Sequence, residues 1–191
     1  MVILRYDECP HTVLLKTVRM TYSYLRYALI VLFLGLGLLL HVQLGLSQAW
    51  YLYLAGFLLL VSHLVFGNVW LAFNSLKRGQ PEKAEALLRQ VWNPGWLVRS
   101  NRAYYYFTLG MLYLQHKKPG EARGHLQKAI SLGLRKPNDH ALALLNLAHI
   151  AYLQNDHGLA RQALTEARAL QPTDLMIKDN LQKLEGMLGR G

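Results

Sequence analysis

One feature constrains this chain more than any other: no Asp, Glu, Lys or Arg occurs from Tyr27 to Phe73. A helix that crosses the hydrocarbon core of a bilayer needs about 20 mainly apolar residues. The charge-free run is long enough for two such helices, and the short segment "GLSQ" (45–48) divides it. The sequence therefore predicts a hairpin of two membrane-spanning helices, over residues 24–46 and 50–73.

The flanks of this hairpin predict its orientation. Lys and Arg lie outside both ends of the run, at Arg19 and Arg26 before it and at Lys77 and Arg78 after it, whereas the turn has none. Because positive residues concentrate on the cytoplasmic side of membrane proteins, both termini are expected in the cytoplasm. Residues 1–23 are expected to be cytoplasmic or to lie in the lipid interface, and both Met1 and Met20 fit as the true start.

Composition and charge narrow the class of partner. The chain has 191 residues, of which 52% are hydrophobic and 17% charged, and its net charge is +10. The basic residues are spread along the chain and do not form blocks. This favours the positive charge of a membrane protein's cytoplasmic side over a surface that binds nucleic acid. The single cysteine, Cys9, excludes a disulfide framework and a cysteine-based zinc site. Membrane lipid is thus an expected partner, and nucleic acid is not.

The remainder of the chain repeats with a period of 38 residues. Small and large apolar residues recur in phase, and Gly and Pro fall in the turns "RGQPE", "HKKPGE" and "QNDHG". Apolar residues at such three- and four-residue spacings form one face of a helix, and Gly and Pro stop and start helices. The pattern predicts three helical hairpins. Its columns are Leu71-Ala72, Leu109-Gly110 and Leu147-Ala148; Ala84, Ala122 and Ala160; Leu88, Leu126 and Leu164; and Val91, Ala129 and Ala167.

The copy "ALALLNLAHIAYLQNDHGLARQALTEARALQP" (141–172) resembles the tetratricopeptide repeat family, whose unit is about 34 residues. The resemblance implies an α-solenoid over 65–172, with repeats at about 65–102, 103–140 and 141–172. The extra residues of the longer period lie between hairpins, and Asn68 stands where a bulky aromatic residue is usual. Residues 173–191 are expected to form a capping helix and tail, since the last apolar face of an array must be covered. The expected fold class is all-α.

The hydropathy and the repeat overlap in the stretch from Leu64 to Gly79. Both are satisfied by one continuous helix from about Trp50 to Arg78, which would be roughly 43 Å long. That exceeds a bilayer core of about 30 Å, so its last turns would emerge as the first repeat helix. The sequence therefore predicts that the second span and the first repeat are continuous.

The resemblance also implies a binding surface, because the first helix of each tetratricopeptide hairpin lines a concave groove for a partner peptide or helix. Core packing is the alternative role for the aromatic residues among them. The Lys, Arg and Asn clamp of chaperone-binding relatives is not matched here, since only Asn146 fits it. The expected groove residues are Tyr104, Phe107, Thr108, Met111, Gln115, Leu142, Leu145, Asn146, His149 and Tyr152.

Catalytic motifs are absent from the sequence: it has no GxxxxGK[ST], HExxH or GxSxG pattern. We therefore expect no enzyme activity, no cofactor, no metal site and no small-molecule substrate. His63, inside the second predicted span, is the exception that invites a functional role. It lies about 16 Å from His41 along the membrane normal, too far to share a haem. A neutral His63, hydrogen-bonded to a neighbouring helix or to Tyr27, is the simpler interpretation.

These observations predict a non-catalytic, membrane-anchored adaptor or scaffold that binds protein partners at the cytoplasmic face. The resemblance favours the bacterial inner membrane and a role in assembly or quality control of a membrane or envelope complex. One alternative is a stoichiometric accessory subunit of a large respiratory or secretory membrane complex. A second alternative is a cofactor-bearing subunit that uses His63.

Overall fold

The computed structural model describes residues 28–43, 45–66 and 68–189. All regular secondary structure in these ranges is helical, so the predicted all-α class is confirmed for them. The described residues fall into two compact units, one ending at Gly67 and the other beginning at Asn68.

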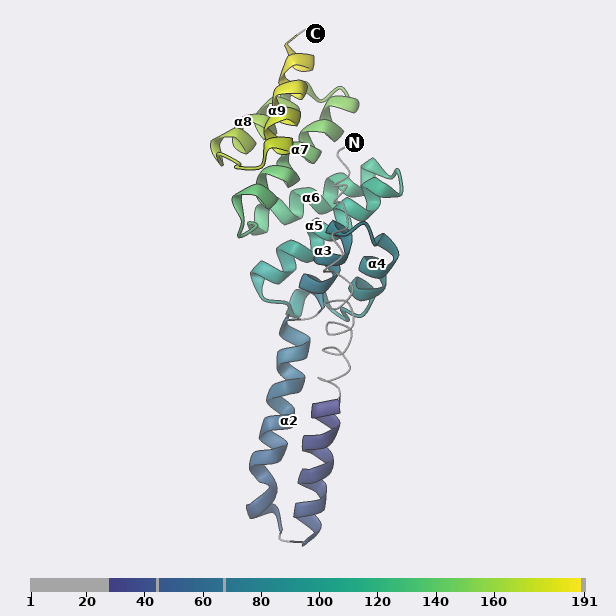
Figure 1. The fold of residues 1–191 in the computed structure, drawn as a ribbon, viewed down its shortest axis with the longest axis vertical. Coiled ribbons are helices and arrows are strands. Elements are labelled where there is room, and N and C mark those ends of the chain that lie inside the picture. Colours follow the sequence, from purple (N-terminus) through teal and green to yellow (C-terminus); the bar gives the residue numbers. More distant parts are fainter. Residues whose placement is uncertain (1–27, 44, 67, 190–191) are drawn as a thin grey trace, which may run out of the picture. The chain divides into compact units, whose positions relative to one another are not determined.

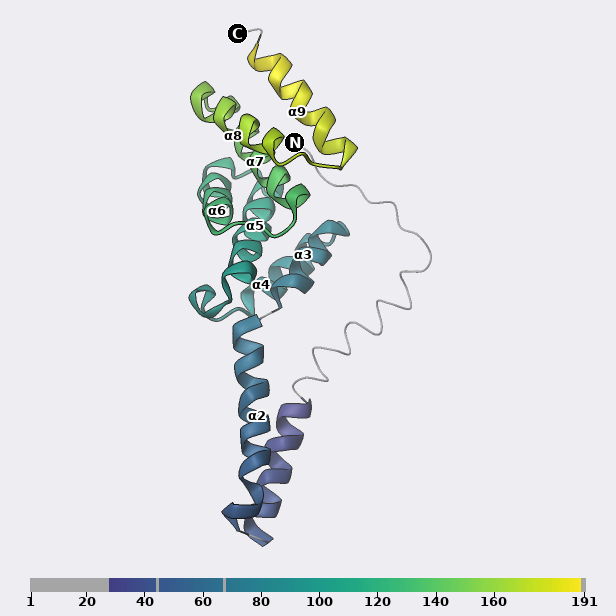
Figure 2. The ribbon, with the colours of Figure 1, turned by 90° about the vertical axis from the view of Figure 1, so that its left-hand side faces the viewer.

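The first unit is a pair of helices, over residues 28–43 and over Leu46–Phe66 (α2), which lie side by side in Figures 1 and 2. Glycines lie where they meet: a Cβ on Gly56 would be 2.9 Å from Leu34 Cδ2, and one on Gly37 would be 3.3 Å from Tyr53 Cε1. His41 Nδ1 lies 3.3 Å from the Tyr53 hydroxyl. Close approach at glycine is typical of helix packing in lipid, where the hydrophobic effect does not drive side chains together.

The continuous helix predicted from Trp50 to Arg78 needs correction, whereas the predicted pair of spans stays a prediction. No helix among the described residues is both long and apolar enough to cross a membrane, so the predicted pair of spans is not supported there. The helix expected from Trp50 to Arg78 is two helices, because α2 ends at Phe66 and α3 (Val69–Lys77) begins after Asn68. Val69 and Phe73 are buried in the core of the second unit, and therefore belong to the repeat.

Several sequence predictions fall on residues outside the described ranges. These are residues 1–23, with the choice between Met1 and Met20, and the pairing of His63 with Tyr27. The backbone of His63 lies in α2, while its side chain is among those that the structure does not describe.

The second unit is a stack of antiparallel helix pairs (Figures 1 and 2). Pro81, Pro119 and Pro137 each occupy the first turn of a helix, where the missing N–H of proline costs nothing. A short 3-10 helix, η1 (Pro94–Trp96), precedes the second pair. The pairs are α3 with α4 (Pro81–Arg89), α5 (Arg99–Gln115) with α6 (Pro119–Leu132), and α7 (Pro137–Leu153) with α8 (His157–Ala169); α9 (Leu175–Leu188) then packs on α7 and α8.

The 38-residue period of the sequence is also a period of the backbone. Gly79, Lys117 and Asn155 follow the first helix of each pair with φ values of 70°, 57° and 59°. The next residue in each turn donates its N–H to a carbonyl five residues earlier, as in Gln80 N to Ser75 O at 3.0 Å. The alanines at 84, 122 and 160 are completely buried between the helices of their pairs.

The tightest approach within a pair is at Gly110 of α5. A Cβ placed there would lie 2.9 Å from Leu126 Cγ and 3.1 Å from Leu126 Cδ2. Leu126 belongs to α6 and is fully buried, so it has no free space to move into. The position therefore requires glycine for packing, since its φ is not in the left-handed region.

Substituting Gly110→Ala is expected to destabilise the second unit. Gly124→Ala is the matched control, because it lies inside α6 with no atom within 4 Å of its added Cβ. Both variants gain about 1 kcal/mol of helix propensity, whereas only Gly110→Ala overpacks the core, at about 1–3 kcal/mol. Thermal unfolding followed by helical circular dichroism should place Gly110→Ala below Gly124→Ala. Equal stability of the two variants would show that Leu126 yields without cost.

Candidate binding site

The inner helices of the first two pairs meet through a cluster of aromatic rings. Phe73 of α3 lies 5.0 Å from Tyr104 and 5.7 Å from Phe107, both of α5, between ring centroids. Trp70 packs edge-on to Tyr104 at 5.8 Å and keeps about half of its surface exposed. Such pairs contribute beyond the area that they bury, so this cluster holds α3 firmly against α5.

A buried carboxylate joins this cluster to the third pair. Asp139, in the first turn of α7, accepts hydrogen bonds from Lys77 Nζ at 3.0 Å and from the Tyr104 hydroxyl at 2.8 Å. A negative charge is also favoured at a helix N-terminus by the aligned peptide dipoles. One side chain thereby connects α3, α5 and α7, the first helices of all three pairs.

The electrostatics of Tyr104 follow from this arrangement. Burial raises the pKa of the Tyr104 phenol well above its usual value, and the hydrogen bond to Asp139 and the charge of that carboxylate raise it further. The phenol therefore remains protonated and acts as a donor, not as a base. This arrangement is suited to holding the three inner helices together.

The structure divides the ten expected groove residues into two groups. Six of them are buried: Tyr104, Phe107, Thr108, Leu142, Leu145 and Asn146. Four are partly exposed: Met111, Gln115, His149 and Tyr152. The side chains of the buried group are enclosed by the protein itself, and the partner groove stays a prediction. Even the amide of Asn146 is used internally, since it donates to the Leu142 carbonyl at 2.8 Å.

One inner-face residue was missed by the sequence reasoning. Trp70 lies 38 residues before Thr108 and 76 before Asn146, in the same repeat column, and it is exposed. Trp70 lies inside the second predicted span, 50–73, and was therefore not counted among the groove residues. Extending the column back into the first copy would have identified it. The Lys136 ammonium lies 5.3 Å from the Trp70 ring centroid, at the start of the third pair.

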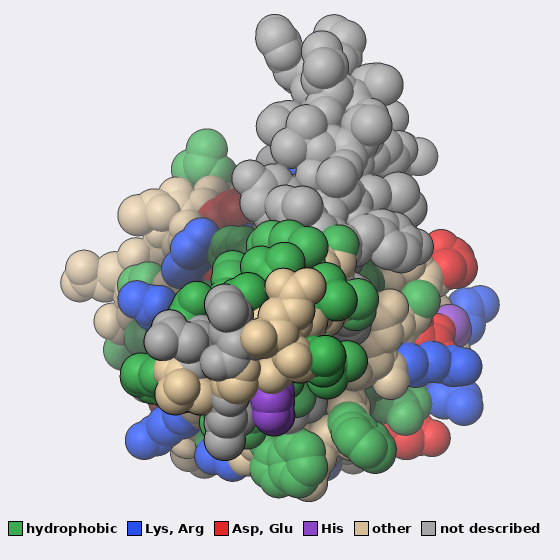
Figure 3. Space-filling view, turned by 90° about the horizontal axis from the view of Figure 1, so that it is seen from below, with side chains coloured by type: hydrophobic (Ala, Val, Ile, Leu, Met, Phe, Trp, Pro, Cys, Tyr) green, Lys and Arg blue, Asp and Glu red, His purple; other side chains and the backbone are tan. Residues whose placement is uncertain are grey.

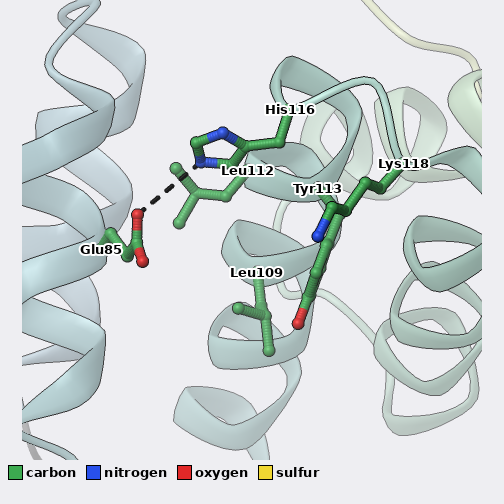
Figure 4. A pocket seen from close by; sticks show the side chains of 6 residues that line it. All are labelled: Glu85, Leu109, Leu112, Tyr113, His116 and Lys118. Carbon is green, nitrogen blue, oxygen red and sulfur yellow. Dashed lines mark ion pairs between the residues drawn. The ribbon is translucent and has the colours of Figure 1, made fainter.

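A pocket of about 410 Å³ opens on a different side, between α4 and α5 (Figure 4). Its lining combines leucines with charged and aromatic groups, of which the Glu85 carboxylate and the His116 ring point toward one another, while Lys118 lies beside Tyr113 (Figure 4). Glu85 of α4 faces His116 at the end of α5, with 3.7 Å between the carboxylate and Nε2. The lining residues are Glu85, Leu109, Leu112, Tyr113, His116 and Lys118.

The negative charge in this pocket comes from Glu85. A hydrogen bond from Arg89, 2.7 Å away, is the largest cause that lowers the pKa of Glu85, and the charge of Arg89 and His116 add to it. Glu85 is therefore an anion at neutral pH, opposite the Lys118 ammonium. Sequence reasoning had not linked these residues, because Glu85 and His116 lie in different repeats.

The pocket can accept an amphipathic group. Its volume is within the range of about 300–1,000 Å³ that is typical of ligand sites, with an apolar floor and opposite charges at its walls. A metal site is not indicated, because no cluster of three or more His, Cys, Asp or Glu occurs among the described residues. The chain matches no family model, no curated protein and no solved structure.

Removing the Asp139 carboxylate is expected to destabilise the repeat unit. Asp139→Ala leaves the buried Tyr104 hydroxyl and the partly buried Lys77 without their acceptor, at about 2–4 kcal/mol. Asp139→Asn should lose less, because its amide oxygen still accepts from Tyr104. Asp179→Ala, at an exposed position of α9, is the control and should change stability by less than about 0.5 kcal/mol. Thermal unfolding of the three variants measures this, and equal effects at 139 and 179 would contradict the bridging role.

Proposed function

We propose that this protein is a non-catalytic, membrane-anchored adaptor of the tetratricopeptide type that binds protein partners at the cytoplasmic face of a membrane. The observation that carries the proposal is the apolar outer surface of the first unit. This surface is made of large side chains that are exposed along both of its helices. They are Val31, Leu32, Leu34, Leu36, Leu38, Leu39, Val42, Trp50, Tyr51, Leu54, Phe57, Leu58 and Leu60.

The energetic cost of this surface in water supports a lipid environment. Burying one such side chain is worth about 1.5–3 kcal/mol, so this set represents on the order of 10 kcal/mol even if half of each is covered. The net stability of a domain is only about 5–15 kcal/mol. No charged residue interrupts the surface, and Figure 3 shows hydrophobic side chains gathered at the end of the hairpin. A bilayer would cover it.

The second unit supports a binding role. Stacked helix pairs build an extended surface, and the α4–α5 pocket offers a place for a partner's side chain. A bacterial inner-membrane setting, with a role in assembly or quality control of an envelope complex, remains the proposed context. It rests on the tetratricopeptide resemblance.

A fixed accessory subunit of a larger membrane complex is the second candidate. The observation that favours it is the burial of six of the ten expected groove residues, among them Tyr104 and Phe107 of the aromatic cluster. A transient peptide-binding protein requires an open groove, whereas a structural subunit can bind through its remaining surfaces.

The proposed topology can be tested by labelling cysteines in intact cells. In a Cys9→Ser background, Ser47→Cys at the hairpin turn should react with a membrane-impermeant maleimide from outside. Gly158→Cys should react only after the cells are opened; its added Cβ would have no neighbour closer than 4.0 Å, so the substitution fits. The positive flanks predict this pattern. The reverse labelling would place the repeats outside the cytoplasm.

Partner binding through the pocket can be tested by charge reversal at its rim. Lys118→Glu places a second carboxylate opposite Glu85, and Lys178→Glu makes the same change on an exposed position of α9. Affinity purification in mild detergent with quantitative mass spectrometry should recover a partner with wild type and Lys178→Glu that is lost with Lys118→Glu. Recovery of that partner at a fixed one-to-one ratio would favour the subunit. Unchanged recovery with Lys118→Glu would exclude the pocket.

A further inference from the structure

We propose that residues 90–98, the tryptophan loop, lie in the headgroup region of an anionic bilayer. The repeat unit would then contact the membrane at a second point. This inference rests on the proposed membrane anchor and adds to it a lipid-binding surface on the second unit.

The tryptophan loop exposes more large apolar surface than any other short segment described in the second unit. Trp92 is 87% exposed, Trp96 56% and Val98 43%. Tryptophan has an apolar body and a polar N–H, which is why it concentrates at the membrane–water interface. Two such side chains only four residues apart form a surface of the right character for that region.

The exposure of these side chains is fixed by the structure of the loop. Leu97, between Trp96 and Val98, is buried in the core and holds the loop down. The Asn93 side chain accepts a hydrogen bond from Gly95 N at 2.8 Å and so shapes the start of η1. Arg99 Nε donates to the Leu132 carbonyl at 3.0 Å just after the loop. The tryptophans are therefore presented outward by an ordered segment.

The position of the loop follows from one hydrogen bond. Asn68, the first residue of the second unit, donates its side-chain N–H to Gln90 Oε1 at 2.7 Å. Phe66, the last residue of α2, is two residues before Asn68, and Trp92 is two residues after Gln90. Each of these steps spans at most about 8 Å of chain. Within the second unit, the loop therefore lies close to Asn68, the residue with which that unit begins.

The charge near the loop selects the type of lipid. No Asp or Glu occurs between Glu85 and Glu121, whereas Arg89, Arg99 and Arg102 flank the tryptophans. The positive charge of Arg89 is offset by its ion pair with Glu85, whereas the contact of Arg99 with the Leu132 carbonyl brings no opposite charge. Basic groups beside interfacial aromatics attract the anionic headgroups of the cytoplasmic leaflet. A protein partner could also cover two tryptophans, but the positive charge around the loop and its closeness to Asn68, the first residue after the proposed anchor, favour lipid.

The test uses the full chain in nanodiscs made of equal parts of phosphatidylcholine and phosphatidylglycerol with brominated acyl chains. Single cysteines in a Cys9→Ser background carry an environment-sensitive fluorophore. Trp92→Cys reports on the loop. Leu175→Cys is the matched control, because Leu175 is also a highly exposed apolar residue of the second unit, at the start of α9. Leu58→Cys, on the exposed face of α2, reports on the anchor.

The fluorophore at position 92 should be quenched by the brominated lipid and protected from iodide, whereas that at 175 should show the opposite. The quenching of the fluorophore at position 92 by lipid should fall when phosphatidylglycerol is replaced by phosphatidylcholine. If position 92 matches position 175 while position 58 is quenched by lipid, the loop proposal is wrong and the anchor stands. If position 58 is not quenched, the membrane anchor itself is wrong, and the loop proposal falls with it.

Discussion

The repeat unit depends on helices that approach one another where one of them offers no more than a methyl group. Gly110 leaves no space for a Cβ beside Leu126, and the alanines at 84, 122 and 160 are fully buried at equivalent positions in the three pairs. Close approach multiplies the small dispersion contacts between two helices. Because the same residue types recur every 38 positions, each pair closes in the same way, and the turns with φ near +60° repeat with them.

Stacking of the pairs on one another rests on hydrogen bonds to Asp139 and on aromatic contacts. These contacts also bury residues that were expected to bind a partner. Asp139 accepts from Lys77 and Tyr104, and the aromatic rings around Phe73 fill the space between the inner helices. A buried carboxylate is tolerated only when its partners are in place, so the three inner helices are fixed in mutual register. The same contacts bury Tyr104 and Phe107, two of the residues that were expected to line a peptide groove. Packing of the stack and burial of these two side chains thus have one cause.

The sequence alone predicted the helix pairs and their turns. It did not predict features that depend on how separate helices pack against one another. Small residues and turn signals predict the helix pairs because both act within a few residues. Val69 and Phe73 are apolar whether they face lipid or a protein core, so hydropathy could not place the boundary at residues 67–68. The burial of Tyr104 and Phe107 depends on how one pair lies on the next. The α4–α5 pocket was not predicted for the same reason, because Glu85 and His116 are distant in the sequence and come together only in the folded structure.

Asn68 shows how one departure from the repeat pattern can join the two helices of a pair. A bulky aromatic residue at this position would pack into its own helix pair. The amide of Asn68 instead binds Gln90, which ties the first turn of α3 to the end of α4. The start of α3 and the end of α4 are thereby joined within the first pair, in addition to the apolar contacts that Ala72 and Leu76 of α3 make with Ala84, Leu87 and Leu88 of α4.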